Sequence, residues 1–132
     1  MTRARPAAQR RAAETLGRSA EEACTAVLRR QGWVVVAERF RPPRGQGAGE
    51  IDIIARRGDM VAFIEVKARA SVREAVESVS PRQRERIARA AEAFLALSPD
   101  LAALDCRFDV MLVTKDGTGD PVHLEDAWRP GW

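Results

Sequence analysis

Hydrophobic residues recur at helical spacing in two segments of the chain. The first runs from about residue 12 to residue 30, where Leu16, Ala20, Cys24 and Val27 share one face before Gly32 ends the pattern. The second runs from Ser80-Pro81 to about residue 97, because serine is a good N-cap and proline suits the first helical position. Its apolar face is formed by Ile87, Ala90, Ala91 and Phe94. Both segments are predicted to be helices that pack against a core.

Four other segments are rich in β-branched and aliphatic residues and predict strands. They cover residues 33–40, 50–55, 60–67 and 107–114, and a shorter fifth candidate covers 122–128. The turn RRGD, residues 56–59, makes a hairpin of the second and third strands, whereas the Pro- and Gly-rich stretch 41–49 is a loop. The order α-β-β-β-α-β predicts a single α/β domain over 1–132, with about 1–11 as a flexible basic tail.

Composition places the chain among soluble globular proteins and limits its chemistry. Hydrophobic residues make up 45% and charged residues 31%, and no apolar run approaches the roughly 18 residues that span a bilayer. The basic N-terminus has no apolar stretch behind it, so we expect no secretory signal, no membrane partner and a cytoplasmic location. Cys24, Cys106 and His123 lie far apart without zinc-ligand spacing, which argues against a zinc site.

Arginine dominates the basic residues, with 20 Arg and two Lys among 22. Guanidinium groups bind phosphate oxygens in pairs, so the bias suits a nucleic-acid partner, although a GC-rich genome would also produce it. Arg82, Arg86 and Arg89 line one stripe of the second helix, and a solvated charged face is the competing interpretation. With Arg41 and Arg44 in the loop, they are the candidate nucleic-acid contacts.

The segment GEIDIIARRGDMVAFIEVKAR, residues 49–69, holds the candidate chemistry. Residues two apart in a strand share a face, so Glu50 accompanies Asp52 and Glu65 accompanies Lys67. The hairpin can set Asp52 beside Glu65, while Ile51, Ile53, Ile64 and Val66 point the other way. Two facing carboxylates repel, and a hard divalent cation removes that cost. A surface of solvated salt bridges is the alternative, but aliphatic flanks argue against an exposed edge.

Asp52 followed by Glu65-Val66-Lys67 resembles the D…ExK signature of PD-(D/E)xK nucleases. Further segments resemble the YraN family, small bacterial proteins of poorly defined function related in fold to Holliday-junction resolvases of archaeal type. These segments are Gly17 and Glu21, Gly32, residues 49–52, residues 63–69 and residues 107–110. The resemblance extends from about residue 17 to 128 and implies a restriction-endonuclease-like fold with a mixed sheet flanked by helices.

The resemblance also implies roles for individual residues. Asp52 and Glu65, with the Val66 carbonyl, would hold Mg²⁺ or Mn²⁺, and Lys67 would be catalytic. Glu21 matches a helix glutamate that reaches such sites, although a boundary carboxylate paired with an arginine fits equally well. Gln83 stands where the family has lysine. Because Ser80-x-x-Gln83 is also a capping box, we expect capping to be its main role, with a site contact as a second.

The expected function is a metal-dependent phosphodiesterase that acts on nucleic acid, with DNA favoured over RNA and with branched and linear substrates both left open. The alternative is a non-catalytic nucleic-acid-binding or adaptor protein on a nuclease scaffold. Resolvase relatives are dimers, which makes a homodimer an expectation of the resemblance. Two departures from the family bear on substrate contacts. Where the family usually shows Asn-x-Arg before the GEID segment, the chain reads Ala37-Glu38-Arg39-Phe40-Arg41, and the loop before Gly49 is longer.

Overall fold

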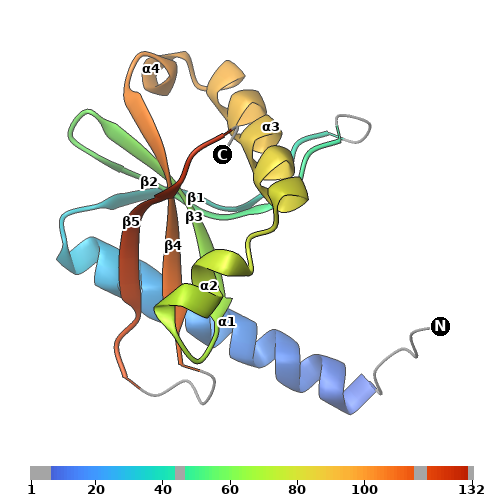
Figure 1. Ribbon diagram of the computed structural model, residues 1–132. Helices are drawn as coiled ribbons and strands as arrows, with labels where there is room; N and C mark the ends of the chain where they lie inside the picture. The colour runs from blue at the N-terminus through green and yellow to red at the C-terminus, as the bar shows by residue number, and fades with distance from the viewer. Residues whose placement is uncertain (1–6, 44–46, 115–118, 131–132) are drawn as a thin grey trace.

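A five-stranded mixed sheet with helices on both faces forms the body of the computed structural model (Figure 1). The structure describes residues 7–43, 47–114 and 119–130, and of residues 7–18 it describes only the helical backbone. The strand order is β1-β2-β3-β4-β5. Only β3 and β4 run parallel, while the other three neighbouring pairs are antiparallel. This confirms the predicted α/β class and is compatible with a restriction-endonuclease-like fold.

The elements follow the predicted order with two additions. Their bounds are α1 Ala7–Arg30, β1 Val34–Phe40, β2 Ile51–Arg57, β3 Met60–Ala68, α2 Val72–Glu77, α3 Pro81–Ala96, α4 Pro99–Ala102, β4 Asp105–Val113 and β5 Val122–Trp128. The sequence pattern did not predict α2 or α4, because six and four residues are too few to establish a 3.6-residue period. It also placed the tail boundary too late, since α1 begins at Ala7.

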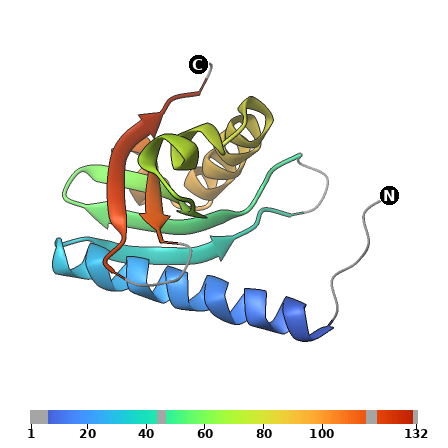
Figure 2. The ribbon, with the colours of Figure 1, turned by 60° about the horizontal axis from the view of Figure 1, so that its bottom comes forward.

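The sheet separates two hydrophobic cores. α1 lies across one face, and α2 and α3 lie on the other (Figure 2). On the α1 face, Cys24, Val27 and Leu28 pack against Ile53, Ile64 and Met111. On the α3 face, Ile87, Ala90 and Phe94 pack against Ile54, Phe63 and Val110. None of the described helices is long and apolar enough to cross a membrane.

The β2–β3 hairpin is regular at its turn and opens at its far end. Gly58 takes a φ of +58°, a left-handed conformation that favours glycine, and so permits the tight turn to Met60. From there the ladder pairs residues as far as Ile53 with Ile64. The same register would next set Asp52 opposite Glu65, as predicted, but no ladder pairing forms there.

One expectation about β2 is wrong. Ile51 and Ile53 were expected to share a face, yet Ile51 is buried in the α3-side core and Ile53 in the α1-side core. The regular alternation fails because the ladder to β3 stops between them and because β1 is kinked opposite, where Arg39 has a φ of +51°. Asp52 therefore sits at an irregular point of the sheet rather than on a flat strand.

A cluster of polar side chains surrounds Asp109 in the middle of β4. Asp109 is fully buried and accepts hydrogen bonds from Arg107 Nε, at 3.0 Å, and from the Asp126 N–H, at 2.9 Å. His123 Nε2 lies 2.7 Å from the same carboxylate. These contacts tie Asp109 and His123 into the fold and join β4 to β5. Trp33 and Trp128 are buried.

Ser80 fixes the start of α3, because its Oγ accepts the N–H of Gln83 and caps the helix. Removing a cap oxygen leaves a helix donor without its partner. We therefore expect Ser80→Ala to lower the free energy of unfolding in urea by about 1 kcal/mol and Ser80→Gly by only a few tenths. Equal stability of wild type and Ser80→Ala would show that the cap contributes nothing.

Candidate functional site

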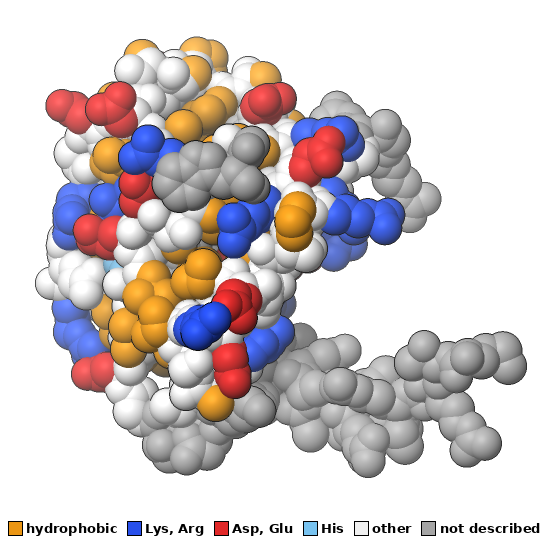
Figure 3. Space-filling model, in the orientation of Figure 1, with side chains coloured by type: hydrophobic (Ala, Val, Ile, Leu, Met, Phe, Trp, Pro, Cys, Tyr) orange, Lys and Arg blue, Asp and Glu red, His pale blue; other side chains and the backbone are white. Residues whose placement is uncertain are grey.

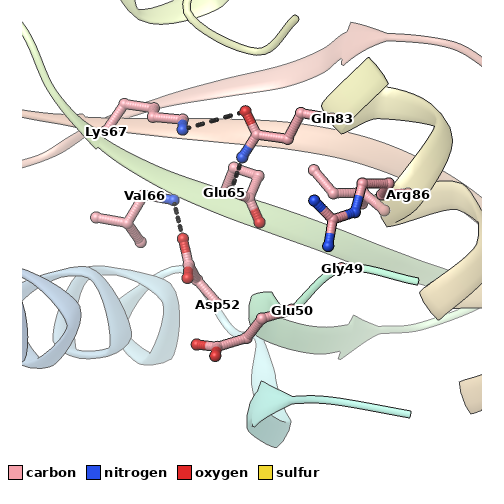
Figure 4. Close-up of a pocket in the computed structure, with 9 residues that line it drawn as sticks. Gly49, Glu50, Asp52, Glu65, Val66, Lys67, Gln83 and Arg86 are labelled. Carbon is pink, nitrogen blue, oxygen red and sulfur yellow. Dashed lines mark hydrogen bonds between the residues drawn. The ribbon is translucent and has the colours of Figure 1, made fainter. Parts of the chain in front are cut away.

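A hollow of about 410 Å³ opens where β2 and β3 part and α3 passes over them. Figure 4 shows Asp52, Glu65, Lys67 and Gln83 converging on it from β2, β3 and α3. The rim on the β2 side is set by Gly49, whose N–H donates to the Arg86 carbonyl at 3.1 Å. A Cβ at Gly49 would lie 3.4 Å from the Arg86 Cβ, so the close approach of the loop to α3 favours glycine.

The Asp52 side chain replaces a backbone acceptor where the ladder between β2 and β3 is interrupted. Its Oδ2 accepts the Val66 N–H at 2.8 Å, which satisfies a backbone donor that the regular register would have paired. Burial, together with the charges of Glu21 and Glu50, raises the pKa of Asp52 to about 6, against the lowering effect of that hydrogen bond and of Lys67.

Glu65 is the more deeply buried member of the pair, with 4% of its surface exposed. Burial and the neighbouring charge of Asp52 raise its pKa to about 8, and Lys67 opposes that shift. Its Oε2 accepts from Gln83 Nε2 at 3.3 Å, while its Oε1 is buried with no hydrogen-bond partner among the described residues. A buried carboxylate oxygen without a partner is costly, so this atom needs a proton or a cation.

Gln83 joins the carboxylate to the amine. Lys67 Nζ donates to Gln83 Oε1 at 3.5 Å, and an ammonium can only donate, so the amide nitrogen faces Glu65. The backbone N–H of Gln83 donates to Ser80 Oγ, which confirms the predicted cap. The side chain does not return to Ser80 to complete a capping box, because it is engaged by Glu65 and Lys67. The site contact expected as a second role is therefore present.

The two outer acids are each held by an arginine from β1 or the residue that follows it. Glu50 lines the hollow, and its Oε2 accepts from Arg41 at 2.6 Å. Glu21 on α1 does not line the hollow, and its Oε2 accepts from Arg39 Nε at 2.8 Å. The sequence allowed Glu21 either a site role or an arginine partner, and the structure gives it the arginine while keeping its charge close enough to affect Asp52.

The arginines predicted to contact nucleic acid differ in their surroundings. Arg86 lines the hollow, and Arg82 is exposed on α3. Arg89 was expected on a stripe free of acids, but its guanidinium donates to Glu85 at 2.6 Å, one helical turn away. Arg41 is the partner of Glu50, and Arg44 lies outside the described residues. Figure 3 shows Lys and Arg side chains over α3 and beside the β1–β2 connection, next to the hollow.

The donor set fits a hard divalent cation. Mg²⁺ and Mn²⁺ take oxygen ligands, and Mg²⁺ commonly uses one or two carboxylates with waters and substrate oxygens completing the shell. Asp52 and Glu65 supply the carboxylates, and Val66 lines the same hollow. In the described part of the chain, no three His, Cys, Asp or Glu side chains come together to hold a metal by themselves. The unpartnered Oε1 of Glu65 is the atom that such a cation would satisfy.

Arg39 is the residue near the site that sequence reasoning did not select. The comparison with the family pattern treated the whole segment 37–41 as a departure that puts substrate contacts in doubt, and did not assign Arg39 a role. The sequence did contain a signal for it: Arg39 lies two residues before Arg41, which was selected, and both precede the GEID segment. Its backbone conformation could not be read from the sequence, because arginine rarely adopts a positive φ.

Comparisons with known proteins point to one family. The model of "Uncharacterised protein family UPF0102" matches residues 20–113. A UPF0102 protein of Paramagnetospirillum magneticum is 47% identical over 98% of both chains. A second, from Azorhizobium caulinodans, is 47% identical over 94% of this chain and 91% of its own length. A third, from a Bradyrhizobium species, is 50% identical over 91% of this chain and 81% of its own length.

The raised pKa values predict a pH-dependent stability in metal-free buffer. The folded protein keeps a proton on Glu65 that the unfolded chain releases, so the free energy of unfolding falls as the pH rises from about 4.5 to about 8. Below that range Glu65 is protonated in both the folded and the unfolded protein. Above it Glu65 is ionised in both, and the folded protein carries the full cost of a buried charged carboxylate. We expect the melting temperature of wild type to fall by several degrees across this window, and that of Glu65→Gln to fall less.

Glu92→Gln is the matched control, because it makes the same change at an exposed glutamate of α3. It should keep the wild-type slope of melting temperature against pH. Parallel curves for wild type and Glu65→Gln would mean that Glu65 carries no proton at neutral pH in the folded protein.

Proposed function

The chain belongs to the uncharacterised protein family UPF0102, also called YraN, and on that premise we propose that it is a metal-dependent phosphodiesterase acting on nucleic acid. The resemblance to PD-(D/E)xK nucleases motivates the reaction class. The support from this molecule is local: two desolvated carboxylates and one lysine share a hollow, and the hollow opens beside exposed arginines. DNA is the proposed substrate and Mg²⁺ or Mn²⁺ the proposed cation.

The unpartnered buried oxygen of Glu65 is the observation that carries the proposal. A structural salt bridge would have given this carboxylate an arginine, as it has for Glu21 and Glu50. Glu65 instead faces Asp52, so ionising it in the fold costs desolvation and like-charge repulsion that apolar residues would have avoided. Sites that retain such a cost are commonly functional, because the same carboxylates then bind a cation strongly.

Each residue of the hollow has a separate task in this proposal. Asp52 and Glu65, with the Val66 carbonyl, hold the cation, which when bound supplies charge neutralisation at the phosphate and lowers the pKa of water. The Lys67 ammonium donates to a phosphate oxygen or orients the attacking water, which favours the transition state as negative charge develops. Gln83 keeps Lys67 and Glu65 in place through its two hydrogen bonds.

Arginine contacts would supply affinity without reading sequence. Arg86 at the hollow and Arg82 on the exposed side of α3 can meet the phosphate backbone, and Arg41 can do so beside Glu50. Arg89 contributes less in this arrangement, because Glu85 already offsets its charge. Binding of this kind weakens steeply with salt.

A cleavage panel tests the proposed activity. Wild type is incubated with Mn²⁺ and with branched, flapped, single-stranded and duplex DNA, with matching RNA in parallel. We expect cleavage of at least one substrate and its loss in EDTA. We expect Lys67→Ala to reduce the rate by at least about a hundredfold, since it removes a donor to the developing charge. Binding and melting temperature should stay close to those of wild type.

Arg73→Ala serves as the control, because it removes an exposed cation on α2, outside the hollow. It should cut at the wild-type rate. Full activity of Lys67→Ala would rule out the catalytic role, and binding of all substrates without cleavage of any would identify a non-catalytic nucleic-acid-binding protein instead.

A further inference from the structure

Arg39 has an unusual backbone for its residue type. It is one of two non-glycine residues with a positive φ in the described part of the chain, the other being Asp126. Left-handed backbone is unfavourable for a long side chain, and such positions concentrate at functional sites. The register pairs Glu38 with Ile53 and Phe40 with Ile51, which sets Arg39 directly across from Asp52.

The packing of Ala37 and Phe40 explains why β1 is kinked at position 39, but not why the residue there is an arginine. Ala37 and Phe40 both pack against the α3-side core, although residues three apart in a regular strand face opposite sides. The turn at Arg39 allows this, and the Phe40 ring lies 5.2 Å from that of Phe94. A glycine would adopt the same backbone with less strain, so the kink in β1 gives no reason for a guanidinium at this position.

The Arg39 guanidinium is anchored at one atom and open at the others. Nε donates to Glu21 Oε2 at 2.8 Å, and Glu21 is only 17% exposed, whereas Arg39 is 45% exposed. Its two terminal nitrogens have no hydrogen-bond partner among the described residues. A planar fork held from behind by a carboxylate is preorganised to bind a second set of oxygens with its free edge.

We propose that Arg39 is a phosphate-binding residue that holds the nucleic-acid backbone next to the hollow, a role that rests on the proposed function. The oxygens it would bind belong to a phosphodiester neighbouring the one at Lys67. Glu21 fixes the direction of the guanidinium and offsets part of its charge. Arg41 and Glu50 form a second arginine–glutamate pair on the rim of the hollow, but there the carboxylate contacts a terminal nitrogen, Nη2, at 2.6 Å.

The rival account is that Arg39 merely neutralises Glu21. That account predicts that removing the side chain destabilises the fold and leaves nucleic-acid binding unchanged. Our inference predicts the reverse for Arg39→Gly, because glycine relaxes the left-handed backbone while removing the phosphate contact. The two accounts thus differ in whether Arg39→Gly lowers the stability of the fold and in whether it weakens nucleic-acid binding.

The experiment measures melting temperature and binding of fluorescein-labelled duplex and single-stranded DNA at a series of salt concentrations in Ca²⁺, a hard cation with the same oxygen preference. We expect Arg39→Gly to melt at or above the wild-type temperature. The slope of log affinity against log salt should become shallower by roughly 0.9 for the duplex and roughly 0.7 for the single strand. Arg39→Gln should lose the same slope and also melt lower, since it keeps the strain.

Arg73→Gln is the matched control, because Arg73 Nε donates to Glu77 at 2.9 Å in an ion pair of the same geometry outside the hollow. It should leave both slopes unchanged. An Arg39→Gly protein with the wild-type slope on both probes overturns the inference, whether or not wild type cuts DNA in Mn²⁺. Wild type that binds but does not cut overturns the proposed activity alone, and wild type that binds neither probe overturns both.

Discussion

Asp52 accepts the N–H of Val66 at the point where the β2–β3 ladder ends, and the rest of the site depends on that contact. A regular ladder would have paired Asp52 with Glu65 across two closed strands and left no space between them. With the side chain replacing a backbone acceptor, the strands part without leaving the Val66 donor unsatisfied. The hollow opens there, and α3 covers it through the close contact of Gly49 with Arg86.

The four acidic residues in and around the hollow form an outer pair and an inner pair. The outer acids, Glu21 and Glu50, each have an arginine partner. The inner acids, Asp52 and Glu65, have no arginine partner among the residues that the structure describes, and burial raises the pKa of both. An arginine beside Glu65 would have stabilised the folded protein and would also have excluded a cation from the hollow. The inner pair therefore lowers the stability of the metal-free protein in a way that a bound divalent cation would reverse.

Periodicity and strand pairing were sufficient to predict the main elements from the sequence. The helices α1 and α3, the β2–β3 hairpin and the approach of Asp52 to Glu65 are all consequences of spacing along the chain. The same reasoning did not predict the short helices α2 and α4, the break in alternation between Ile51 and Ile53, or the left-handed Arg39. The two helices have too few residues to show a helical period. The other two features lie where tertiary packing, such as that of Phe40 on Phe94, outweighs local preference. Both roles of Gln83 were predicted, but the side chain was expected mainly in a capping box, whereas only the backbone N–H meets Ser80 and the side chain contacts Lys67 and Glu65.

Calorimetric titration with Mn²⁺ at neutral pH, in two buffers of different ionisation enthalpy, tests the central claim that this buried carboxylate pair is a cation site. Since burial raises the pKa of Glu65 to about 8, the metal-free protein holds a proton there that a cation must displace. The account predicts that binding by wild type releases close to one proton and that Glu65→Gln binds far more weakly without that release. Equal binding by the two proteins, with no proton released by either, would contradict it.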